Sequence, residues 1–133
     1  MLSTQPSSSS ENDVLTLDRV CARAGAFRLS DVSISVGQGE SHVLLGPSGA
    51  GKTTLLEAII GLRSLTGGRV ELSGRDLAGV PAEKRGMGYL PQRLSLFPHL
   101  TVRENIVYGP RSRRLRPVDY QPVVDALVEL ELD

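Results

Sequence analysis

Residues 46–53 combine glycines, a lysine and a threonine at the spacing G-x-x-x-x-G-K-T. Glycine lets the backbone curl so that successive N–H groups point inward, and no side chain blocks a bound anion. In this pattern the lysine reaches the β- and γ-phosphates of a nucleotide triphosphate, and the threonine hydroxyl ligates Mg²⁺. The residues predicted to bind the phosphates are Gly46, Pro47, Ser48, Gly49, Ala50, Gly51, Lys52, Thr53 and Thr54.

Such a loop needs a strand before it and a helix after it. Residues 41–45 read Ser-His-Val-Leu-Leu, a short apolar run typical of a strand that is covered on both faces. Residues 54–60 predict a helix, which Gly61 ends. The positive end of that helix dipole would face the same phosphates. The alternative, a glycine-rich surface turn that binds nothing, leaves these neighbours unexplained.

The first part of the chain otherwise reads mainly as strands. Residues 28–36 alternate between apolar and polar side chains, which predicts a half-buried antiparallel strand. We expect residues 1–13, which contain four consecutive serines, to form a disordered tail. Further expected elements are strands over 14–20 and 69–72, a short helix over 81–85 and a buried strand over 88–90.

The later part of the chain reads as helical. Thr101 and Glu104 form a T-x-x-E pattern, which predicts a capping box and a helix that ends at Tyr108. Residues 117–132 carry apolar side chains at helical spacing. Between these helices lie Arg111, Arg113, Arg114 and Arg116. Such a cluster could contact phosphate or lipid head groups, although a solvated loop is the more common case.

Composition narrows the class of protein. The chain has 133 residues, enough for one domain with a core, and its 15 basic and 15 acidic residues balance, which disfavours bulk attraction to nucleic acid or lipid. A single cysteine, Cys21, excludes an internal disulfide and a cysteine zinc cluster. The sequence shows neither an apolar run long enough to span a bilayer nor a signal peptide. We therefore expect a cytoplasmic protein.

A second motif narrows the kind of nucleotide-binding protein. Residues 88–92 read Gly-Tyr-Leu-Pro-Gln, and residues 96–106 read LFPHLTVRENI. Together with the phosphate loop, these runs resemble the Q-loop region of ATP-binding-cassette (ABC) ATPases, in particular importer subunits of the molybdate, tungstate, sulfate and polyamine group. The resemblance covers 14–133. It implies an α/β P-loop fold of ABC type, with antiparallel strands and a parallel-sheet core in 14–92 and the Q-loop and start of a helical subdomain in 92–133.

The resemblance also implies a mechanism and partners. Gln92 matches the glutamine that reaches Mg²⁺ and the attacking water, so it is both the catalytic candidate and a second metal ligand beside Thr53. The ligands would be ATP and Mg²⁺. The expected partners are a transmembrane permease subunit and a second ATPase subunit in a dimer, with no nucleic acid. Such a subunit lies on the cytoplasmic side, peripheral on the inner face of the cell membrane, and couples ATP hydrolysis to solute import.

The sequence departs from the family pattern in two ways. Ala24 stands where the family places an aromatic ring against adenine, and Arg23 or Phe27 would have to replace that ring. The family's signature, its metal-binding aspartate, its catalytic glutamate and its switch histidine are not found in the 133 residues, since His42 and His99 lie too early. We therefore expect the N-terminal portion of an importer ATPase, inactive by itself, with an exposed apolar edge at 41–45. The alternative is a stand-alone nucleotide-binding or regulatory module that does not hydrolyse ATP.

Overall fold

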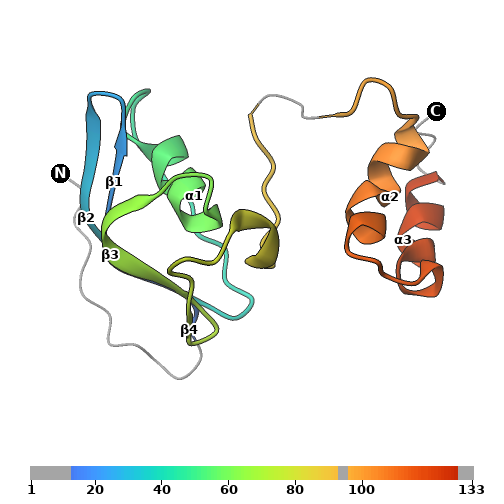
Figure 1. Cartoon of the computed structure of the whole chain (residues 1–133), viewed down its shortest axis with the longest axis horizontal. Coiled ribbons are helices and arrows are strands. Elements are labelled where there is room, and N and C mark those ends of the chain that lie inside the picture. The colour runs from blue at the N-terminus through green and yellow to red at the C-terminus, as the bar shows by residue number, and fades with distance from the viewer. Residues whose placement is uncertain (1–12, 93–95, 129–133) are drawn as a thin grey trace. The chain divides into compact units, whose positions relative to one another are not determined.

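The computed structural model describes residues 13–92 and 96–128, and its contacts divide the chain into two compact units. The first unit runs to Tyr89 and the second begins at Leu90. Figure 1 shows the elements of each. The predicted tail falls on residues 1–12, outside the described residues, and on Asp13, which begins the first strand.

The first unit contains an antiparallel sheet. Its strands are β1 (Asp13–Ala24), β2 (Phe27–Gly37), β3 (Leu65–Leu72) and β4 (Arg75–Asp76), in the order β2-β1-β3-β4. Gly25 lies in the two-residue turn between β1 and β2 with a φ of +59°, a conformation that glycine adopts at little cost. The predicted strands over 14–20, 28–36 and 69–72 are confirmed, and each is longer than expected.

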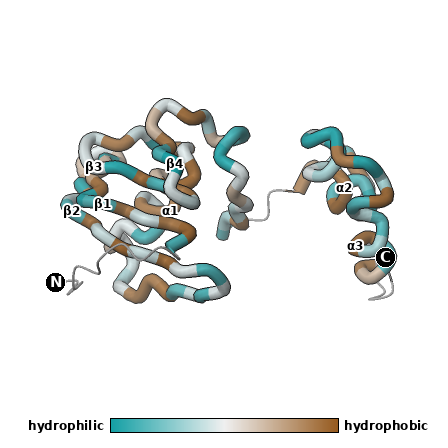
Figure 2. The backbone as a smooth tube through the Cα atoms, turned by 90° about the horizontal axis from the view of Figure 1, so that it is seen from below, coloured by the Kyte–Doolittle hydropathy of each residue, from teal (hydrophilic) through white to brown (hydrophobic). Residues whose placement is uncertain are grey.

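Irregular pairing between β1 and β2 keeps apolar side chains on one face. Leu17 pairs with Ile34 and Val20 with Val32, so the register shifts between them, and Arg19 has a φ of +48°. Asp31 has a φ of +55° beside a second shift. Each shift adds a residue to the strand. Leu17 and Val20, three residues apart, are therefore both buried, which strict alternation would not allow. Figure 2 shows the apolar positions along these strands.

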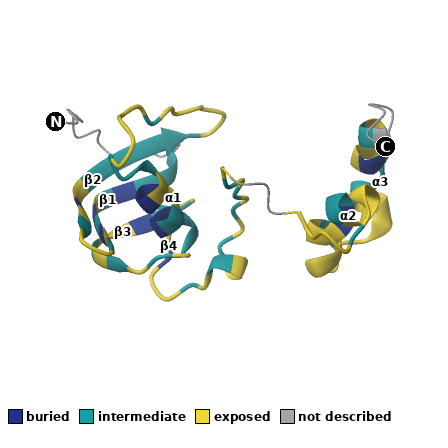
Figure 3. Ribbon diagram, turned by 90° about the horizontal axis from the view of Figure 1, so that it is seen from above, coloured by how far each residue is buried: buried dark blue, intermediate teal, exposed yellow. Residues whose placement is uncertain are grey.

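Helix α1 (Lys52–Ile60) packs against β1 and buries one side. Its buried apolar residues Leu55, Ala58 and Ile59 follow the i, i+3, i+4 spacing of a helix face. The same core includes Leu17, Val20, Ala22, Leu29, Val70 and Leu77 (Figure 3). Gly61, with a φ of +86°, ends the helix as predicted. A short 3₁₀ helix, η1 (Ala82–Lys84), lies within the predicted helix 81–85.

The two strands predicted for the parallel core are wrong for the described structure. Residues 41–45 and 88–90 have irregular backbones, and Val43, Leu45 and Leu90 are 77%, 79% and 87% exposed. A strand exists only where a neighbour takes up its backbone N–H and C=O groups. The described residues provide no parallel neighbour for either segment, so both keep the apolar composition of a core strand without its pairing. The expected exposed strand edge at 41–45 is therefore absent as well, although the side chains of Val43 and Leu45 are exposed.

The second unit contains helices α2 (Val102–Ser112) and α3 (Pro117–Val128). Thr101 and Glu104 form the predicted capping box. The predicted end of α2 at Tyr108 is wrong, because the helix continues through Pro110 to Ser112. Proline removes one N–H near the end of the helix, where the loss is smaller than in the middle. The predicted helix 117–132 is confirmed to Val128, and 129–132 lie outside the described residues. Among the described helices, none has the length and apolarity needed to cross a membrane.

Candidate nucleotide-binding site

The predicted phosphate loop curls into the start of α1. Gly49 and Gly51 have φ values of +85° and +90°, the left-handed region that favours glycine. The Ala50 N–H donates to the Pro47 carbonyl at 3.2 Å and closes a turn. Gly51 is the N-cap residue of α1, and its carbonyl accepts the first helical hydrogen bond from the Leu55 N–H at 2.9 Å. The motif glycines therefore occupy the positions where the backbone needs them.

The first turn of α1 presents its backbone N–H groups without a side-chain cap. A helix N-terminus carries partial positive charge. The first turn of α1 contains no acidic residue that would neutralise this charge. Thr53 is exposed, so its hydroxyl is accessible for a metal ion. Thr54 is 8% exposed, so its predicted contribution to phosphate binding would come from its backbone rather than from its side chain.

Lys52 lies across its own loop. Its ammonium group donates to the carbonyl of Gly46 at 2.7 Å and to that of Pro47 at 2.9 Å. Both acceptors are neutral, so the charge of the lysine is not neutralised by a carboxylate there. The loop therefore combines a cation and a helix N-terminus within a few residues, the arrangement that a polyphosphate needs.

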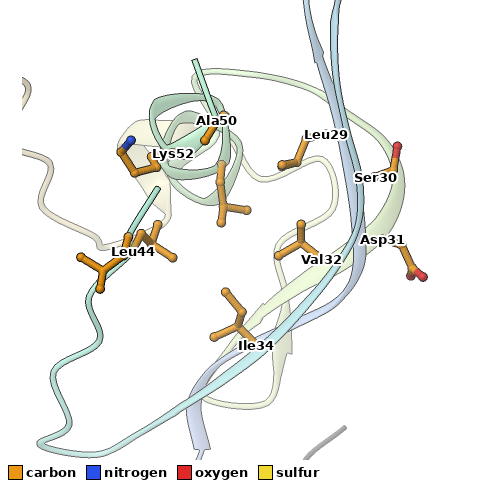
Figure 4. Close-up of a pocket in the computed structure, with 11 residues that line it drawn as sticks. Leu29, Ser30, Asp31, Val32, Ile34, Leu44, Ala50 and Lys52 are labelled. Atoms are coloured by element: carbon orange, nitrogen blue, oxygen red, sulfur yellow. The ribbon is translucent and has the colours of Figure 1, made fainter. Parts of the chain in front are cut away.

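An apolar pocket of about 270 Å³ lies beside the loop, between β2, α1 and residues 44–45. Leu29, Val32 and Ile34 point into it from β2, whereas Ser30 and Asp31 point to the other side of the strand (Figure 4). Ala50 and Lys52 also line the pocket. The apolar side chains of β2 suit packing against another apolar segment, and they offer no donors to phosphate.

Two residues that support the loop helix carry no sequence motif. The Arg85 guanidinium donates to the Ile59 carbonyl at 2.7 Å and to the Val80 carbonyl at 2.9 Å, with longer bonds to Ala58 and Leu77. It thereby binds the C-terminal carbonyls of α1. Phe27 packs against the core beside Gly51 at the opposite end of the helix. Nothing in the sequence around Arg85 or Phe27 predicts these contacts.

Gln92 belongs to the second unit and is exposed, and its predicted role in metal and water binding stays a prediction. The segment after it is organised by a residue that the sequence did not single out. The Asn105 side chain accepts from the Phe97 N–H at 2.8 Å and donates to the carbonyls of Leu100 and Thr101 at 3.1 and 3.0 Å. The Phe97 ring also packs on Tyr108, with centroids 4.3 Å apart. Asn105 therefore ties residues 97–101 to α2.

Comparison with known protein families identifies the family of the chain. A family model described as "ABC transporter" matches residues 29–132, which is more than half of the chain. The chain belongs to the ABC transporter family. Membership in this family implies ATP binding, and the assignment of the loop at 46–53 to the phosphates stays a prediction. The predicted P-loop fold of ABC type is confirmed at the level of family and overall fold.

Individual relatives agree with the predicted importer type. The chain is 48% identical over 67% of its length to the molybdate/tungstate import ATP-binding protein WtpC of Pyrococcus horikoshii, of which it covers 26%. It is 44% identical over 88% of its length to the Fe(3+) ions import ATP-binding protein FbpC of Streptomyces coelicolor, of which it covers 34%. A solved ATP-binding subunit of an ABC transporter matches 82% of the chain, with a TM-score of 0.73 and 30% identity, and the chain covers 46% of it. The chain thus spans about a quarter to a third of the length of these curated relatives.

Proposed function

We propose that the chain supplies the ATP-binding loop of an importer subunit that couples ATP binding and hydrolysis to solute uptake. The observation that carries this proposal is the conformation of residues 46–53. Two left-handed glycines, an uncapped helix start and the Lys52 ammonium converge on one loop. The importer names of the relatives support the transport part of the proposal.

Each loop residue would have a separate role. The Lys52 ammonium would leave the Gly46 and Pro47 carbonyls and bind the β- and γ-phosphates. The N–H groups of the loop and of the first turn of α1 would donate to the phosphate oxygens. The Thr53 hydroxyl would ligate Mg²⁺, and Gln92 would contact the metal ion and the attacking water. Among the described residues no cluster of three or more His, Cys, Asp or Glu side chains could hold a metal ion.

The proposed partners are inferred from the same family membership. A permease subunit in the membrane and a second ATPase subunit are the proposed companions, with the chain peripheral on the cytoplasmic face. The names of the two relatives given above span molybdate, tungstate and iron, so the shared step that we propose is ATP-driven import. Hydrolysis needs groups that position water and neutralise developing charge. The 133 residues carry the phosphate loop and Gln92 from that set, so we propose ATP binding with negligible turnover for this chain taken alone.

The metal-binding role of Thr53 tests this proposal with binding as the readout. ATP affinity is measured by titration with and without Mg²⁺ for the wild type, Thr53→Val and Thr66→Val. Thr66 is the matched control, because it is an exposed threonine of the same unit, in β3. The wild type and Thr66→Val should bind ATP more tightly with Mg²⁺, whereas Thr53→Val should lose that difference. A Thr53→Val variant with an unchanged Mg²⁺ effect would contradict the assigned role.

A further inference from the structure

The turn between α2 and α3 concentrates positive charge. Residues 111–116, here called the arginine turn, contain four arginines and no acidic residue. Every residue of the turn is exposed. The chain as a whole is neutral, with 15 basic and 15 acidic residues, so this charge is local and not a property of the composition. A local cluster of this kind attracts anions at short range, within about 10 Å at ordinary ionic strength.

The backbone of the arginine turn is ordered by its own hydrogen bonds. The Arg114 N–H donates to the Arg111 carbonyl at 2.9 Å, and the Leu115 N–H donates to the Pro110 carbonyl at 3.0 Å. The Ser112 hydroxyl donates to the Gly109 carbonyl at 2.8 Å. Arg114 has a φ of +57°, a left-handed conformation that is common in turns. The side chains therefore project from a fixed turn.

Most of this charge is not neutralised within the described residues. Arg116 is paired with Asp119, with 3.2 Å between Nη2 and Oδ1. Neither Arg113 nor Arg114 forms an ion pair with a carboxylate in the part of the chain that the structure describes. Two guanidinium groups, each with five donors in a planar fork that fits phosphate and carboxylate, are thus available to oxyanions.

The arginine turn also contains an exposed apolar residue. Leu115 is 46% exposed between Arg114 and Arg116, and Val118 is 69% exposed at the start of α3. A soluble phosphate or an acidic peptide would satisfy the arginines but would leave Leu115 in water. The head-group region of a lipid bilayer accepts both, because phosphates lie beside the boundary of the acyl chains. The combination therefore favours a lipid surface.

We propose that the arginine turn binds the phosphates of anionic phospholipids, with Arg113 and Arg114 as the principal contacts and Leu115 at the acyl boundary. The contact does not require nucleotide in the phosphate loop, which lies in the other unit. Each arginine near an anionic surface contributes enough free energy for roughly a fivefold change in affinity. Removal of two charges should therefore weaken binding by about twentyfold or more.

The test measures co-sedimentation of the full chain with vesicles. Phosphatidylcholine vesicles with about 30% phosphatidylglycerol are compared with pure phosphatidylcholine. Arg113→Gln/Arg114→Gln is compared with Arg28→Gln/Arg75→Gln, which removes the same charge from exposed arginines of the first unit. Leu115→Ser tests the apolar contact, and circular dichroism confirms that every variant retains its helices.

The proposal expects binding to the anionic vesicles alone, a loss of about twentyfold in Arg113→Gln/Arg114→Gln, and a smaller loss in Leu115→Ser. The control variant should bind as the wild type does, and saturating ATP·Mg should not displace the vesicles. Equal loss in both double variants would overturn the proposal, since it would show unspecific charge attraction. Full displacement by soluble glycerol phosphate would reassign the turn to free phosphate, and binding to polyglutamate without binding to vesicles would reassign it to an acidic protein segment.

Discussion

The ring of Phe27 fills the space that a side chain at Gly51 would need. A Cβ atom on Gly51 would lie 2.6 Å from Phe27 Cζ and 3.4 Å from Leu29 Cδ1. Gly51 is also left-handed, with a φ of +90°. Two independent constraints, backbone conformation and the close approach of β2, therefore require glycine at the last position before Lys52. The phosphate loop is fixed to the sheet through this contact.

Gly51→Ala should destabilise the first unit and remove ATP binding. The left-handed conformation costs alanine about 1–2 kcal/mol, and the clash with the Phe27 ring adds about 1–3 kcal/mol. Urea unfolding of the variant measures the sum. Gly79→Ala is the matched control, because Gly79 has a φ of +68° but open space around its Cα. A loss no greater than in Gly79→Ala would contradict the packing argument.

Arg85 should contribute to stability through the end of α1. Its guanidinium binds carbonyls of that helix and of residues 77–80, and a cation at a helix C-terminus also interacts favourably with the dipole. Arg85→Ala should lower the free energy of unfolding by about 2–3 kcal/mol, and Arg85→Lys by less, since one ammonium replaces some of the bonds. Arg75→Ala, at an exposed position, should change stability by less than about 0.5 kcal/mol. Equal effects of the two alanine variants in chemical unfolding would contradict this account.

Ala24→Tyr should strengthen ATP binding. Ala24 is the last residue of β1 and stands where the resemblance places an adenine-stacking ring. The Phe27 ring already packs against the core beside Gly51. Base stacking on an aromatic ring contributes about 1–3 kcal/mol where it has been measured. Titration with ATP and with inorganic tripolyphosphate separates base stacking from phosphate binding, because only the affinity for ATP should increase. An equal increase in affinity for both ligands would contradict stacking as the cause.

The capping box of α2 should make the second unit sensitive to acid. Hydrogen bonds from the Thr101 backbone, and then from its hydroxyl, hold the pKa of Glu104 below its usual value. A carboxylate with a lowered folded pKa stabilises fully above its unfolded pKa, and this contribution is lost as pH falls through the folded pKa. The melting temperature of the wild type should therefore decrease when the pH is lowered below about 4.5. In Glu104→Gln the side chain stays polar but carries no charge, so this decrease in melting temperature at low pH should be smaller. Identical plots of melting temperature against pH for the wild type and the variant would contradict the role given to Glu104.

The sequence was most informative where local chemistry determines structure. The left-handed glycines of the loop at 46–53, the end of α1 at Gly61 and the Thr101–Glu104 capping box each depend on a few neighbouring residues, and the last two appear at the predicted positions. The shifts near Arg19 and Asp31 could not be predicted, because strand register follows from packing between β1 and β2. The contacts of Arg85 likewise join segments that are more than twenty residues apart.

The predictions that proved wrong concern segments whose structure depends on neighbours. Val43 and Leu45 have the composition of a core strand but lie exposed, since pairing needs a second strand. Gly109 and Pro110 disfavour a helix locally and so predict an end at Tyr108, but α2 continues to Ser112 and packs against α3. The predicted role of Gln92 likewise depends on groups beyond its own neighbours in the sequence, the metal ion and the attacking water. It stays a prediction.

The central claim is that Lys52 in this loop binds the phosphates of ATP, and the chain offers a direct comparison. Its two lysines are Lys52 and Lys84, and Lys84 lies exposed in η1. Calorimetric titration with ATP·Mg should show binding by the wild type and by Lys84→Ala, and a loss of at least about tenfold in Lys52→Ala, because a charged contact to phosphate contributes about 1.5–3 kcal/mol. Equal affinities of Lys52→Ala and Lys84→Ala for ATP·Mg would contradict the account.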